Sequence, residues 1–135
     1  MILAGCFPEP VNLTPALPGG VYDAQILRYE PCRYSRSGKY RMEIVTFLVL
    51  NGEHQGKRSR AYCCTDYVGD GIPYMDPVEV GIQLLDDIVE ACYCEDMETA
   101  LGERCQIATT IIHLGKHFEL SSVYAVKEIA DVLLD

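Results

Sequence analysis

Hydrophobic and polar residues alternate with a period of two over five stretches of the chain, which is the pattern of β-strands. The first is clear around Tyr22, Ala24 and Ile26, which alternate with Asp23 and Gln25. The second ends in a run of β-branched and aromatic residues, as expected for a strand covered on both faces. The pattern predicts strands over residues 21–30, 39–50, 57–64, 104–113 and 117–126.

Between the third and fourth stretches the period becomes that of an α-helix. Asp76 suits the capping position, with Pro77 in the first turn and Glu79 completing a capping box. Apolar residues at helical spacing then predict the buried face, which consists of Val78, Ile82, Leu85, Val89 and Cys92. Glycines and a proline predict a loop over 65–74, and residues 96–101 predict one further helical turn.

Three strands, a helix and two strands follow one another in the order of a five-stranded oligonucleotide-binding (OB) barrel, whose helix joins strands three and four. We therefore expect a mainly β, OB-like domain over residues 20–126. Four prolines predict an irregular lead-in over 1–19, and residues 127–135 predict a short helix or an acidic tail.

Charge is distributed unevenly along the chain. The formal net charge is −9, which alone argues against a nucleic-acid partner. Eight of the eleven Lys and Arg residues, however, lie between residues 28 and 60, together with three acids. The other residues carry three bases and seventeen acids. This asymmetry predicts one basic surface on an otherwise acidic body.

The basic residues fall on the elements with which OB barrels bind oligonucleotides, namely strands two and three and the loops beside them. Strand alternation predicts that Lys39 shares a face with Arg41, and that Arg58, Arg60 and Tyr62 share another. Cations that follow phosphates and aromatic rings that stack on bases are what single-strand binding requires. The predicted nucleic-acid site is Arg33, Tyr34, Arg36, Lys39, Arg41, Arg58, Arg60, Tyr62 and Lys116.

Three motifs resemble the single-stranded DNA-binding proteins with an OB-type fold that phages encode. They are Gly20-Val21-Tyr22-Asp23-Ala24-Gln25-Ile26, Ser37-Gly38-Lys39, and the stretch from Phe47 through Asn51-Gly52 to Gly56-Lys57. The resemblance implies binding of single-stranded DNA in phage replication or recombination, without catalysis, in the cytoplasm of the host. It also implies recruitment of replication or recombination proteins by an acidic tail, to which residues 128–135 correspond weakly.

Seven cysteines are numerous for 135 residues, but their odd number and apolar surroundings favour reduced, intracellular thiols over a disulfide scaffold. No cysteine pair has the usual spacing of a zinc site, and no signature of a catalytic nucleophile or a phosphate loop occurs. We therefore expect no cofactor, metal or catalytic residue. Whether Cys63, Cys64, Cys92 and Cys94 gather around a metal stays open.

The alternative function is that of an acidic phage protein that binds other proteins, as an inhibitor or a nucleic-acid mimic of a host or defence protein. Its interface would be made by Asp86, Asp87, Glu90, Glu95, Asp96 and Glu98. No apolar run is long enough to span a membrane, which predicts a cytoplasmic protein. The choice between DNA and RNA, the sequence preference and the oligomeric state, including a homo-oligomer, stay open.

Overall fold

A computed structural model describes residues 16–116 and 118–129. The predicted lead-in up to residue 15, the predicted start of the last strand at 117 and the tail from residue 130 onward lie outside the described residues.

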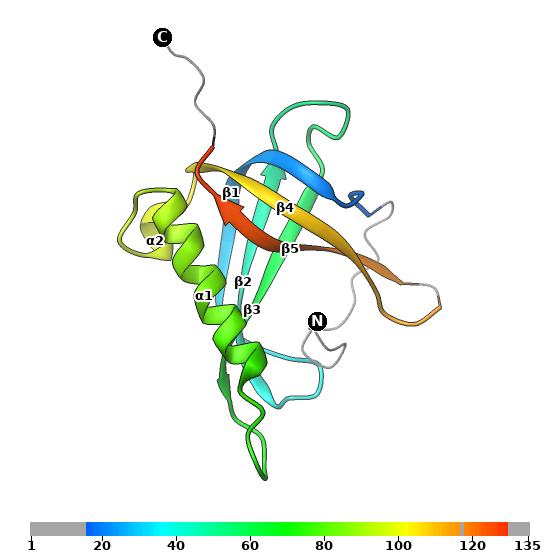
Figure 1. Cartoon of the computed structure of the whole chain (residues 1–135), viewed down its shortest axis with the longest axis vertical. Coiled ribbons are helices and arrows are strands. Elements are labelled where there is room, and N and C mark those ends of the chain that lie inside the picture. The colour runs from blue at the N-terminus through cyan, green and yellow to red at the C-terminus, as the bar shows by residue number, and fades with distance from the viewer. Residues whose placement is uncertain (1–15, 117, 130–135) are drawn as a thin grey trace.

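The described chain forms five strands and two helices in the predicted order (Figure 1). The two helices follow one another between the third and fourth strands. The elements are β1 (Gly20–Tyr34), β2 (Tyr40–Val49), β3 (Arg58–Tyr67), α1 (Asp76–Ala91), α2 (Met97–Ala100), β4 (Arg104–His113) and β5 (Glu119–Lys127).

The strands close into a barrel in the order β1-β2-β3-β5-β4. Neighbouring strands are antiparallel except β3 and β5, which run parallel and close the barrel where Arg60 pairs with Ser122. A closed five-stranded barrel with a helix between β3 and β4 is consistent with an OB-like fold. The predicted fold is therefore confirmed.

Two strands are longer than predicted. β1 continues through Pro31 and Cys32 to Tyr34, so half of the connection expected between the first two strands, residues 31–38, is strand. The proline hides this continuation from the sequence pattern, because β1 passes it with a register shift between Glu30 and Arg33. β3 likewise extends to Tyr67, three residues into the predicted 65–74 loop.

The core fills the barrel interior and the space beneath the helices. Side chains of all five strands, such as Ile26, Phe47 and Val123, pack there against Ile88 of α1 and Met97 of α2. The buried free thiols of Cys63, Cys92 and Cys105 belong to the same core, as expected. Figure 1 shows α1 lying along the side of the barrel formed by β3 and β5.

Helix α1 is rotated from the predicted orientation. Val78 and Cys92 are buried as predicted, and Leu85 and Val89 pack partly buried against the core. The buried residues of α1 are Val78, Gly81, Leu84, Ile88 and Ala91, whereas Ile82 is exposed. The cause is Gly81, because a Cβ atom there would lie 2.2 Å from the Cys64 carbonyl oxygen. Helix and strand thus meet at backbone distance, and this contact sets the rotation of the helix.

The predicted cap of α1 is also wrong. Met75 occupies the capping position, and its carbonyl oxygen accepts hydrogen bonds from the backbone N–H groups of Val78 and Glu79. Asp76 lies one position later, in the first helical turn, and no side chain caps the helix. Its carboxylate and that of Glu79 instead lie near the positive end of the helix dipole.

Candidate nucleic-acid interface

The outer faces of β1, β2, β3 and β5 share a row of polar residues. Backbone pairing aligns Arg28 with Thr46, Thr46 with Arg60, and Arg60 with Ser122. The neighbours of Thr46 in β2 point into the core, so the row itself points outward. Arg28 joins it because a register shift between Ile26 and Arg28 turns the strand.

Four arginines occupy this outer face. Arg60 lies in the row just described, Arg58 is paired with Leu48 one step along β3, and Arg33 is paired with Met42. Together with Arg28 they place four guanidinium groups on one side of β1–β3. We call this the arginine face, defined by Arg28, Arg33, Arg58 and Arg60.

One carboxylate lies among these arginines. Glu30 is paired with Ile44 on the same face, and its carboxylate lies 2.6 Å from the Arg33 guanidinium and 3.6 Å from that of Arg28. The two arginine side chains are exposed, so these ion pairs are screened by solvent and contribute little to stability. The two ion pairs hold the Arg28 and Arg33 guanidinium groups beside each other. The three residues together keep a net positive charge.

Three polar atoms of the row have no hydrogen-bond partner in the described chain. Thr46 Oγ1, Arg60 Nε and Ser122 Oγ are all buried. Such atoms are rare in native proteins and cost about 1–3 kcal/mol each when unpaired. The rest of the Arg60 guanidinium has a partner, because it donates a hydrogen bond to the Tyr62 side chain.

A cavity of about 260 Å³ opens beside this row. Arg58, Arg60 and Tyr62 line it from β3, and Glu119 and Leu120 line it from β5. Arginines therefore border open space on the arginine face, where a ligand can reach them.

Tyr62 lies on the predicted face but is not an open stacking platform. Only 7% of it is exposed, because it packs with Tyr40, Met42 and Leu120 in a second apolar cluster outside the barrel. Burial raises the pKa of its phenol, and the positive charge of Arg60 partly opposes that shift. The structural role of Tyr62 is to contact the Arg60 guanidinium and hold it in place.

Arg41 and Tyr34 do not join the arginine face. They are paired with each other at the ends of β1 and β2 and point to the opposite side from Met42. Arg41 forms a 3.6 Å ion pair with Asp66. Lys39 lies one residue before β2 begins, and Lys39 and Arg41 are both exposed on either side of the buried first residue of β2, so their predicted shared face stays a prediction. Tyr34 is exposed at the end of β1, where its ring is accessible.

The loops at the ends of the strands carry the remaining predicted residues. Arg36 and Lys39 are exposed in the short β1–β2 connection. Lys116 is exposed at the β4–β5 turn, close in sequence to Phe118, whose ring is also exposed. Sequence analysis missed two residues of interest, Phe118 and Arg28. The sequence signal for Phe118 was an aromatic residue next to a basic turn. The position of Arg28 on the outer face depends on a bulge, which the alternation of residues does not reveal.

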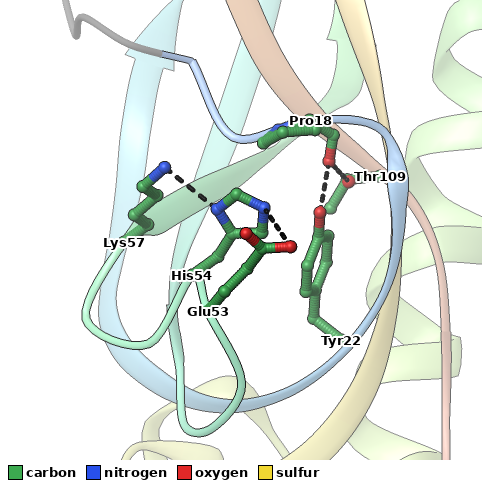
Figure 2. Close-up of polar contacts among 6 residues, drawn as sticks. All are labelled: Pro18, Tyr22, Glu53, His54, Lys57 and Thr109. Carbon is green, nitrogen blue, oxygen red and sulfur yellow. Dashed lines mark hydrogen bonds and ion pairs between the residues drawn. The ribbon is translucent and has the colours of Figure 1, made fainter.

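Lys57 is engaged in holding the β2–β3 turn. Its Nζ lies 2.9 Å from His54 Nδ1, and the His54 ring packs edge to face against Tyr22, with centroids 6.0 Å apart (Figure 2). The Tyr22 hydroxyl donates to the Pro18 carbonyl oxygen at 2.7 Å. This chain of contacts links the turn to β1 and to the segment before it, so we do not count Lys57 with the arginine face.

Within residues 16–116 and 118–129, no group of three or more His, Cys, Asp or Glu side chains is arranged to hold a metal ion. No helix in the same residues is both long and apolar enough to cross a bilayer.

Neither a protein-family model nor a curated protein matches this sequence. The resemblance to phage proteins that bind single-stranded DNA therefore stays a prediction.

Proposed function

We propose that this protein binds single-stranded nucleic acid, with DNA as the expected ligand, along the arginine face. The observation that carries the proposal is the convergence of Arg28, Arg33, Arg58 and Arg60 on the outer face of β1–β3 of an OB-like barrel. This is the face with which OB barrels bind oligonucleotides.

The overall acidity of the chain fits such a role, because cations gathered on one face attract a polyanion locally while the acidic remainder repels it. The strand would then be confined to one path across β1–β3. Two exposed aromatic rings outside the arginine face, Tyr34 at the end of β1 and Phe118 before β5, are available for base stacking. The motifs within residues 20–57 add phage replication or recombination in the host cytoplasm as the biological setting.

The test is fluorescence anisotropy of a labelled oligo-dT, titrated with the full chain at several salt concentrations. If four arginines each neutralise one phosphate, log K falls against log salt with a slope of about −3. Arg60→Ala then weakens binding roughly tenfold, because a charged hydrogen bond is lost.

Arg104→Ala is the matched control, since it removes an equally charged, exposed residue at the start of β4. It is expected to leave the affinity within about twofold. Absence of binding by the folded protein at low salt contradicts the proposal. So does an equal loss of affinity in the Arg60 and Arg104 variants.

A further inference from the structure

The side of the molecule around α1 has a composition unlike the rest. Between Arg60 and Arg104 the sequence contains eleven Asp and Glu residues and no Lys, Arg or His. This stretch comprises most of β3, the loop after it, both helices and the approach to β4. Its negative potential repels nucleic acid and attracts positively charged partners.

The same region concentrates exposed apolar side chains. Among the residues that the structure describes, six of the thirteen exposed large hydrophobic side chains lie between residues 68 and 82. Ile72, at 93% exposure, is the most extreme of all. Figure 1 shows the loop that carries it, between β3 and α1, projecting beyond the barrel. Isolated exposed apolar residues are ordinary, but a concentration of them marks interaction surfaces.

Acidic and apolar residues are interleaved on α1 itself. Glu79, Asp86 and Glu90 lie in one stripe on its solvent side, because their spacing returns to the same face of a helix. Val80 and Ile82, both exposed, flank this stripe on its two sides. We define the α1 surface as this stripe with Val80, Ile82 and Ile72.

We infer that the α1 surface is a docking site for a basic segment of a partner protein in which apolar residues are spaced among lysines and arginines. Charge complementarity selects this occupant, since ten of the eleven acids, all but Asp66, which is paired with Arg41, disfavour nucleic acid and anionic lipid. The exposed apolar side chains make this surface more than a general negative charge. They offer hydrophobic contacts, which salt does not screen as it screens charge attraction. The inference goes beyond the proposed function and leaves the arginine face free for a nucleic-acid strand.

The experiment uses the full chain and two fluorescein-labelled peptides of equal charge, one alternating Lys with Leu and the other Lys with Ser. At moderate salt we expect the Lys/Leu peptide to bind at least tenfold more tightly. The double variant Ile72→Ser with Val80→Ser is expected to lose that preference. Both side chains are exposed, so these changes are not expected to affect folding, and circular dichroism checks it.

The charge contribution is tested by Asp86→Lys, with Glu53→Lys as the matched control in the β2–β3 turn. Asp86→Lys is expected to weaken binding of the Lys/Leu peptide about tenfold, and Glu53→Lys less than threefold. The inference is overturned if the two peptides bind alike, or if both charge reversals have the same effect.

A third outcome points to a different occupant. If sedimentation detects self-association that the Ile72/Val80 variant abolishes, the surface binds a second copy of the chain, and the inference is wrong. Oligo-dT binding by the Ile72/Val80 variant is expected to be the same as that of the parent protein. If the chain binds the Lys/Leu peptide but not oligo-dT, the proposed function fails while this inference stands.

Discussion

Gly81 lies where α1 crosses β3, at a position that has no room for a side chain. In an exposed part of a helix, replacing glycine by alanine adds up to about 1 kcal/mol of stability. Here the new Cβ atom would lie 2.2 Å from the Cys64 carbonyl oxygen and 2.6 Å from its backbone nitrogen. Since both atoms belong to the sheet, neither can move without disturbing the barrel.

Gly81→Ala is therefore expected to lower the free energy of unfolding by about 3 kcal/mol, as measured by urea denaturation. Gln83→Ala on the solvent side of the same helix is the control, with an expected change within about 0.5 kcal/mol. An alanine variant as stable as the parent would mean that the helix does not pack on Cys64 at this distance.

Cys63 makes stability depend on pH in the alkaline range. Burial in the barrel, followed by the negative charge of Glu43, raises the pKa of its thiol from 9.0 to about 12. The native state thus holds this proton more tightly than the unfolded chain. The resulting stabilisation is complete below about pH 9 and is lost as the pH rises toward 12.

Urea denaturation between pH 8 and about pH 11 measures this loss, which amounts to roughly 4 kcal/mol when complete. Cys63→Ala is expected to be less stable at neutral pH but to decline less steeply with rising pH. Tyr29 and Tyr62, whose pKa values burial also raises, remain in both proteins and cancel in the comparison. Parallel pH profiles of the two proteins would contradict the account.

At the scale of the element, β1 determines what the arginine face presents. A shift in register places Arg28 on the outer face, and a second shift near Cys32, whose φ is +62°, carries the strand to Arg33. Glu30 lies between them and neutralises one of the two charges. β1 therefore supplies two arginines that attract phosphate groups and one carboxylate that offsets part of this attraction.

Glu30→Gln is expected to increase the affinity for oligo-dT roughly fivefold, because it frees a guanidinium at a cost in stability of no more than about 1 kcal/mol. Anisotropy titrations measure this, with Glu53→Gln in the β2–β3 turn as the control. Weaker binding by the Glu30 variant would show that the carboxylate orients the arginines for their ligand.

The sequence predicts those elements whose side chains alternate without interruption. β4 was predicted with its observed bounds, since residues 104–113 keep a regular period. Alternation fails where backbone geometry breaks the period, as at the bulge that brings in Arg28. It also fails where a residue acts by having no side chain, as Gly81 does in setting the buried face of α1.

For the candidate site, the sequence identified the strands and loops that carry the basic residues. It did not show for every residue on which face of the sheet the side chain lies. Arg58 and Arg60 share the predicted face because β3 alternates regularly there. Alternation could not show that Arg41 points away from the arginine face and pairs with Asp66 of β3. The burial of Tyr62 depends on a second apolar cluster outside the barrel, which involves residues distant in sequence.

On the scale of the whole molecule, two surfaces of opposite charge lie on one small barrel. The arginine face is formed by β1–β3, and the acidic and apolar α1 surface lies around the helix that packs on β3 and β5. Under the two proposals, polyanions and basic proteins bind to different sides of the barrel. In the proposed function, this separation is what lets a protein with a net charge of −9 bind nucleic acid.

The most direct test of the central claim is a titration of the isotopically labelled protein with oligo-dT, followed by amide NMR. We expect chemical-shift changes concentrated at Arg28, Thr46, Arg60 and the loops around Lys39 and Lys116, with the amides of α1 unaffected. Changes confined to α1 and the loop that carries Ile72, or no changes at low salt, would contradict it.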